Sequence, residues 1–275
     1  MEFLINKPKN YNEDINIQFY QSVWSQNSKY EEFKNFILDL VNNKESKTFY
    51  KFSDGEYYWL TNNQIGSVQS GKRDSNTTKR DLRPFQEGVL KCDYLMCQLL
   101  NRHVEWFSSY FNRDFDFPVD YVYSLVSDKW FTRTFNGKIG IIGADNKLDL
   151  IKSLCEKEEY LKYLEFDGFT DYIKVPQKYL CDNIDSVELE IAESLRNSSS
   201  DIFLIGIGHA QQALLHRLKK YKNAVYIVIG SGVDAYAGIQ DNTRPYMGDW
   251  INYQLKNFDY SKVDVWSPYD NKKFI

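Results

Sequence analysis

Apolar and polar residues follow two different periods along this chain, and together they predict short buried strands separated by amphipathic helices. Residues 29–43 have apolar side chains at the i, i+3, i+4, i+7 spacing of a helix with one buried face. Continuous apolar runs bounded by turn residues, such as 138–143 and 224–230, are typical of fully buried strands. Strands are expected at residues 48–53, 94–100, 138–143, 172–175, 201–208 and 224–230, and helices at 29–43, 104–111, 147–164, 187–195 and 210–220, with a short helix opening at Pro84.

This alternation predicts an α/β fold. Strands separated by helices of this length form βαβ units, so we expect a mostly parallel, Rossmann-like sheet with helices on both faces. The chain is expected to be one domain over residues 1–275, with an N-terminal helical extension over about residues 1–44. Ligands bind such sheets at the carboxyl ends of the strands. The turns at residues 54–56, 206–209 and 230–234 are therefore the candidate sites.

The first turn follows the strand expected at residues 48–53. Asp54 and Glu56 flank Gly55, so both carboxylates can face one point. Hard divalent cations prefer carboxylate oxygens and also bind substrate phosphates. The two carboxylates of this turn could therefore hold a metal ion that binds a diphosphate. The alternative is a β-turn in which Asp54 is the turn former and Glu56 is solvated.

The second turn, in LIGIGHA, joins a strand to a helix. Gly206 and Gly208 would let the backbone and the following helix approach a phosphate. His209 could bind a phosphate or a sugar hydroxyl, or act as a base. Gln211 stands where a dinucleotide fingerprint needs glycine, so no nicotinamide site is predicted. The alternative is a tight turn in which His209 only caps the helix.

The third candidate is the polar segment 229–250, which we expect to be a functional loop. Asp234 could bind a metal ion, hold a ribose or sugar hydroxyl, or serve as a base. Arg244 could clamp a phosphate with two parallel hydrogen bonds, and Tyr246 could stack on a base or sugar ring. The alternative is a surface loop with an internal pair between Arg244 and Asp241.

Composition narrows the class of protein. The chain has 34 basic and 38 acidic residues, a net charge of -4, which gives no support to a nucleic-acid partner. Its four cysteines form no CxxC pair and it has only three histidines, so neither a structural zinc site nor a disulfide framework is expected. Apolar runs stay well short of the roughly 18 residues that span a bilayer. We expect a cytoplasmic protein without an integral membrane segment; its oligomeric state is left open.

These motifs, in this order, resemble the GT-D fold glycosyltransferases, first known as a domain in the glycosylation of streptococcal adhesins. Members carry an R-F-G-D-G-E stretch, and here the corresponding stretch is KFSDGE, with Lys51 and Ser53 in place of the arginine and glycine. The segments LIGIGHAQQALLHRLKK and VYIVIGSGVDAYAG are similar to a later part of the family pattern. The resemblance extends over about residues 45–255.

The resemblance implies a metal-dependent hexosyl- or pentosyltransferase. It would move a sugar from a nucleotide-diphosphate sugar, with a UDP-sugar as the expected donor, to a hydroxyl of a glycan or glycoconjugate. Mn²⁺ or Mg²⁺ on Asp54 and Glu56 would neutralise the leaving diphosphate. Asp234 or His209 would deprotonate the acceptor, and the sequence does not choose between them. The residues expected to contact substrate are Ser53, Asp54, Gly206, Gly208, His209, Arg244 and Tyr246.

Two rival functions remain open from the sequence. KIGIIGADNK, with Gly143 and Asp145 after a strand, could hold the cofactor of a methyltransferase that uses S-adenosylmethionine. The chain could also be a non-catalytic module that binds a sugar or nucleotide. The methyltransferase does not explain why two carboxylates follow the strand at residues 48–53, and the module would not need a metal ion.

Overall fold

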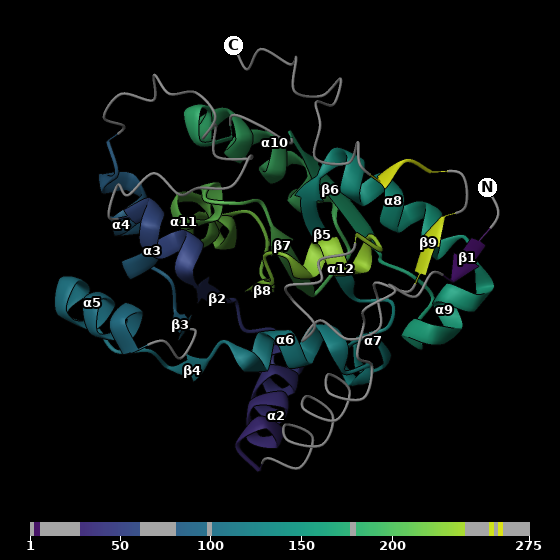
Figure 1. Cartoon of the computed structure of the whole chain (residues 1–275), viewed down its shortest axis with the longest axis horizontal. Coiled ribbons are helices and arrows are strands. Elements are labelled where there is room, and N and C mark those ends of the chain that lie inside the picture. The colour runs from purple at the N-terminus through teal and green to yellow at the C-terminus, as the bar shows by residue number, and fades with distance from the viewer. Residues whose placement is uncertain are drawn as a thin grey trace.

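The core of the molecule is a seven-stranded sheet in which every strand pair is parallel. The computed structural model describes residues 3–5, 28–60, 81–97, 101–176, 180–239, 253–255 and 258–260. The sheet order is β4-β3-β2-β8-β7-β5-β6 (Figure 1). Its strands are β2 (Lys47–Phe52), β3 (Tyr94–Cys97), β4 (Phe117–Pro118), β5 (Ile139–Ala144), β6 (Asp171–Val175), β7 (Ile202–Gly206) and β8 (Val225–Val228). A separate antiparallel pair joins β1 (Phe3–Ile5) to β9 (Tyr253–Leu255).

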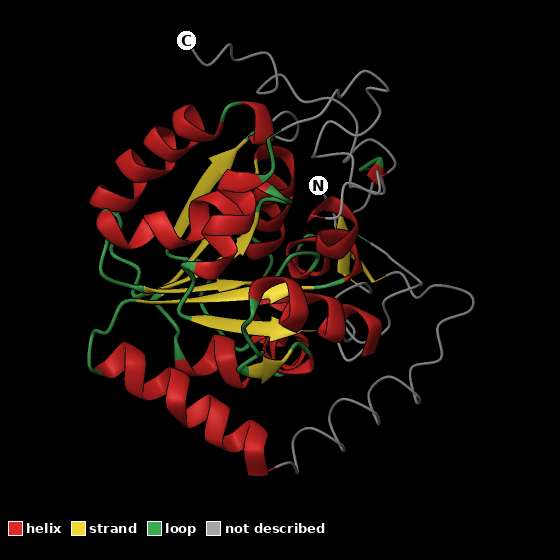
Figure 2. Ribbon diagram, turned by 90° about the vertical axis from the view of Figure 1, so that its left-hand side faces the viewer, coloured by secondary structure: helices red, strands yellow, loops and turns green. Residues whose placement is uncertain are grey.

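Helices cover both faces of this sheet (Figure 2), so the predicted α/β class is confirmed. One face packs against α2 (Ser28–Asn42), α6 (Asp120–Ser127), α7 (Trp130–Thr134), α8 (Asp145–Cys155), α9 (Glu158–Leu164) and α12 (Gly232–Tyr236). The other packs against α3 (Asp54–Leu60), α4 (Arg83–Leu90), α5 (Asn101–Phe111), the short η3 (Leu180–Asp182), α10 (Ile184–Asn197), α11 (Ala210–Leu214) and η4 (Leu215–Lys220). No helix among the described residues is long and apolar enough to cross a membrane.

Burial on both faces explains why the strands are continuous apolar runs in the sequence. Successive side chains of β8 alternate between the two cores: Val225 and Ile227 pack on the α2 side, and Tyr226 and Val228 on the α10 side. The aromatic residues of β2 and its neighbours fill these cores by edge and stacked contacts; Phe49, for example, stacks on Tyr94 at 4.8 Å between ring centroids.

Parallel pairing brings the carboxyl ends of the strands to one edge. The arrowheads visible in Figure 2 point to the same side of the molecule. In register, Gly143 of β5 lies beside Gly206 of β7, and Ile205 lies beside Val228 of β8. We call the ends of β2, β8, β7 and β5, in that spatial order, the carboxyl edge. The residues just after these four strands are neighbours in space.

The single helix expected over residues 147–164 is wrong: two helices occupy this segment. α8 ends at Cys155 and α9 begins at Glu158. Lys157 between them has extended backbone angles, and its N–H bonds the carbonyl of Leu154. The break redirects the chain so that Tyr160 and Leu164 reach the same core as α8. An apolar period alone does not detect this turn, because the apolar spacing continues across it.

Two other elements also differ from expectation. Residues 210–220 form α11 and then the 3-10 helix η4, rather than one α-helix. The expected loop after β8 contains the short helix α12, whose apolar Val233 and Tyr236 are buried against the sheet. α6 and α7 lie in a segment where no helix or strand was predicted.

Candidate functional site

The turn after β2 is the start of a helix, capped by its own sequence. β2 ends at Phe52 and α3 begins at Asp54. The Glu56 carboxylate oxygen Oε2 accepts a hydrogen bond from the backbone N–H of Ser53, at 3.0 Å, and another from the Ser53 hydroxyl. The bond from the Ser53 N–H to the glutamate three residues on is one half of a capping box, and the serine hydroxyl donates to the same carboxylate. Glu56 is therefore buried, only 8 % exposed, and the alternative of a β-turn with a solvated Glu56 does not hold. The side chain of Asp54 lies outside the described part of the chain.

Lys51 lies beside this cap, and its ammonium is buried. The residue is 6 % exposed, its Nζ lies 3.4 Å from Ser53 Oγ, and it faces the Tyr123 ring of α6 at 5.4 Å. No described carboxylate is at ion-pair distance from it. Burial alone would raise the pKa of the Glu56 carboxyl. The Lys51 charge, His209 and the Ser53 hydrogen bond, in that order, lower it by more than burial raises it, so the pKa lies below its ordinary value. Glu56 is ionised at neutral pH.

The turn after β7 packs against α3, the helix that follows β2. His209 is 4 % exposed, and its ring stacks on Trp59 of α3 with 4.6 Å between centroids and 7° between planes. His209 Cε1 lies 3.9 Å from the position that a Cβ of Gly55 would occupy. The Gln212 amide lies 3.4 Å from His209 Nδ1. The first and second candidate turns, about 150 residues apart in the sequence, therefore pack against each other, as expected from parallel strands.

The glycines of these turns have different roles. A Cβ on Gly206 would lie 2.5 Å from Val233 Cγ2 and 2.7 Å from the Gly230 carbonyl oxygen, so protein atoms fill the space that was expected to admit a ligand. Gly206 allows the β7 and β8 turns to approach closely. Gly208 and Gly230 have left-handed backbones, with φ of 57° and 53°, and both are half-buried. A Cβ on Gly230 would lie 3.5 Å from Lys51 Nζ.

Asp234 lies in α12, just after the β8 turn, and an ion pair holds it in place. Its Oδ1 lies 2.5 Å from Nζ of Lys147, the third residue of α8, which follows β5. The Lys147 side chain is 6 % exposed and the Asp234 side chain 28 % exposed. Asp145 and Asn146, at the start of α8, are half-buried next to this pair in the sequence. The ion pair fixes α12 to α8 and leaves part of the Asp234 carboxylate accessible.

The structure thus brings Ser53, Glu56, Gly208, His209 and Asp234 to the carboxyl edge. Arg244 and Tyr246 lie outside the described residues. Three further side chains were not singled out from the sequence as site residues: Lys51 and Lys147 lie at this edge, and the half-buried Asp120 follows β4, two strands from β2.

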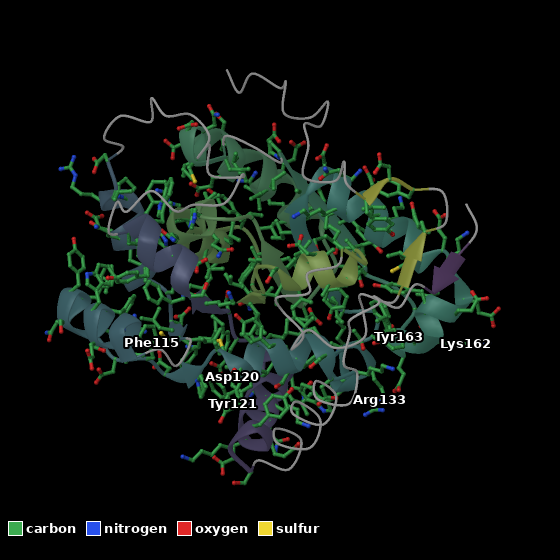
Figure 3. The ribbon with its side chains drawn as sticks, in the orientation of Figure 1. Phe115, Asp120, Tyr121, Arg133, Lys162 and Tyr163 are labelled. Atoms are coloured by element: carbon green, nitrogen blue, oxygen red, sulfur yellow. The ribbon has the colours of Figure 1, made fainter. Side chains whose placement is uncertain are left out.

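Asp120 is the least expected of the three. It begins α6 directly after β4, on the side of the molecule that faces the reader in Figure 3. It is one helical turn before Tyr123, whose ring faces Lys51. Burial raises the pKa of the Asp120 carboxyl. No sequence signal marks it, since its burial depends on how α6 packs.

The described residues do not by themselves fit a divalent ion. Glu56 Oε2 is engaged by two donors of Ser53, and the Lys51 ammonium near Glu56 disfavours a second cation beside it. Within the described ranges there is no group of three His, Cys, Asp or Glu side chains that could hold a metal. We therefore derive no step through a metal ion, and metal binding by Asp54 and Glu56 stays a prediction.

This arrangement favours an anionic ligand and proton transfer. The buried Lys51 lies near the end of β2, and ammonium groups bind phosphate as point charges; the buried Lys147 after β5 is already paired with Asp234. His209 and Asp234 are both groups that can accept a proton from a hydroxyl. The Trp59 ring is half-buried beside His209. The sequence matches no protein-family model and no curated protein.

Proposed function

We propose that the protein is a glycosyltransferase that uses a nucleotide-diphosphate sugar. The observation that carries the proposal is that the Ser53–Glu56 cap and the β8 turn lie beside the buried Lys51, while His209 of the β7 turn packs on the same helix, α3. A phosphorylated ligand is the class that fits a buried ammonium at the carboxyl ends of parallel strands. The resemblance of KFSDGE to the GT-D pattern suggests the donor class, with UDP-sugars first.

The reaction exchanges one bond at the anomeric carbon of the donor. The oxygen of an acceptor hydroxyl bonds to this carbon, the bond between the carbon and the diphosphate oxygen breaks, and the electron pair leaves with the diphosphate. The hydroxyl proton passes to a base, for which His209 and Asp234 are the candidates. Asp234 is the more exposed of the two, and His209, like Lys51, lies close enough to Glu56 to act on its charge.

The geometry at the end of β5 argues against the rival function, a methyltransferase with its cofactor site there. A Cβ on Gly143 would lie 3.2 Å from Leu148 and 3.3 Å from Val233, so protein side chains occupy the side on which a cofactor would approach. A binding module without activity remains the alternative from another class, because it would use the same buried cations and aromatic rings.

A screen of nucleotide sugars for slow donor hydrolysis tests the proposal. We expect one or more donors to release nucleoside diphosphate in the absence of acceptor, and His209→Gln or Asp234→Asn to lower that rate by about 10²-fold or more if the residue is the base. Calorimetric titration with uridine diphosphate and with S-adenosylmethionine separates the rivals. Binding of S-adenosylmethionine would favour a methyltransferase, and binding of uridine diphosphate without turnover of any donor would favour the module.

A further inference from the structure

Lys51 is a buried ammonium with no close carboxylate partner among the residues that the structure describes. It follows Tyr50 within β2, and its residue is 6 % exposed. Its one described hydrogen bond, to Ser53 Oγ, is long at 3.4 Å. Among the described side chains no carboxylate pairs with it at close range, and the Glu56 carboxylate acts on it only from a greater distance. An ammonium has three N–H donors, so most of its hydrogen-bonding capacity is unused by the described residues.

Such an arrangement is costly unless something compensates for it. Moving an ammonium out of water costs several kcal/mol, and a close counter-charge with good hydrogen bonds is what normally offsets that cost. The Tyr123 ring at 5.4 Å and the Glu56 charge offset part of it. Glu56 cannot approach further without leaving the cap, where its Oε2 holds the N–H and the hydroxyl of Ser53.

The space beside the ammonium is bounded by a glycine. Gly230 lies at the turn after β8, and a Cβ there would be 3.5 Å from Lys51 Nζ. Its left-handed backbone accounts for glycine at this position, and without a side chain the turn packs directly against the Lys51 ammonium. Gly230 and Ser231 are half-buried, so the β8 turn beside Lys51 is itself partly exposed at the carboxyl edge.

We infer that Lys51 binds the diphosphate of the donor and takes up the charge that develops on it as it leaves, so that the protein needs no divalent ion for this purpose. This inference rests on the proposed function and specifies how its leaving group is held. The lysine stands where the resemblance would have an arginine, and both are cations that bind phosphate. Glu56 is then a positioning residue: it caps α3, holds Ser53 and offsets the charge of Lys51 between turnovers.

Calorimetric titration of the full chain with uridine diphosphate, in EDTA and then in Mn²⁺, tests the inference. In EDTA we expect uridine diphosphate to bind, Lys51→Met to weaken it at least about 10-fold, and Lys51→Arg to restore part of the loss. Binding of uridine, which has no phosphate, should change less than 2-fold in either variant. Lys47→Met is the matched control, because Lys47 lies on the same strand at its other end, half-exposed, with Glu45 3.8 Å away. It should bind uridine diphosphate like the wild type.

The titration of the wild type does not depend on how the variants fold. If uridine diphosphate binds the wild type only when Mn²⁺ is present, the inference is overturned while the proposed function stands. If Lys51→Met, with a native circular dichroism spectrum, binds uridine diphosphate in EDTA as tightly as the wild type, the inference is also overturned. If uridine diphosphate binds in neither buffer, the proposed function fails and the inference with it.

Discussion

At the scale of single residues, Glu56 combines two roles that are usually separate. Its carboxylate caps the start of α3 through Ser53, and its charge faces the buried Lys51 and His209. The capping pattern S-x-x-E is visible in the sequence as Ser53 to Glu56, and it would have predicted a helix here rather than a turn. The burial of Glu56 is not visible, because it depends on the β7 and β8 turns.

Glu56→Gln is expected to destabilise the protein in a pH-dependent way. Glutamine keeps an oxygen that can accept the Ser53 N–H but loses the charge, so we expect a loss of about 1 kcal/mol in the free energy of unfolding at pH 7. The pKa of Glu56 is lowered in the folded protein, so its charge contributes fully above the ordinary value of 4.5 and is lost as the pH falls through the folded pKa.

Urea unfolding of wild type and variant between pH 7 and pH 3 checks this. The two stability curves should converge in acid. Glu87→Gln is the control, since Glu87 is an exposed helix residue paired with Lys91 at 3.5 Å, and its effect should stay within about 0.5 kcal/mol. A difference between wild type and Glu56→Gln that is constant over the whole range would contradict the electrostatic role.

Gly206→Ala and Gly55→Ala are expected to act in opposite directions. Alanine at 206 would place its Cβ 2.5 Å from Val233 Cγ2 and 2.7 Å from a backbone oxygen, so we expect a loss of about 1–3 kcal/mol as the β7 and β8 turns separate. At Gly55 the nearest atom is His209 Cε1 at 3.9 Å, and alanine favours the helix by up to about 1 kcal/mol. Thermal unfolding measures both, and a Gly206→Ala protein as stable as the wild type would show that the turns are not in close contact.

At the scale of elements, α8 and α12 are joined by the pair of Lys147 and Asp234, which are 87 residues apart in the sequence. A double-mutant cycle with Lys147→Met and Asp234→Asn should give a coupling of about 1–3 kcal/mol, because the lysine is buried. The control cycle is the exposed pair of Lys162 (labelled in Figure 3) and Glu158, both on α9, with a coupling of at most about 0.5 kcal/mol. Equal couplings in both cycles would mean that burial adds nothing to the Lys147 pair.

The elements also show where sequence patterns are sufficient and where they are not. β5, β7 and β8 were predictable within one or two residues because both faces of each strand are buried, which leaves a continuous apolar run. The break at Lys157 and the helix α12 were not predictable, because each is set by contacts with the core rather than by a glycine, proline or change of period.

At the scale of the whole molecule, parallel topology is what made the site predictable. Once the strands are parallel, the turns at 54–56, 206–209 and 230–234 must share an edge, and the contacts between Gly55 and His209 and between Gly206 and Val233 agree with that. The burial of Lys51 and the partner of Asp234 could not be predicted, since both are decided by side chains far away in the sequence.

A crystal structure of the protein with bound uridine diphosphate tests the central claim most directly. The account predicts that the diphosphate lies at the carboxyl edge, with a phosphate oxygen about 3 Å from Lys51 Nζ on the side of the Gly230 turn. A diphosphate bound at the amino ends of the strands, or held at the carboxyl edge by a metal ion on Glu56 with Lys51 out of reach, would contradict it.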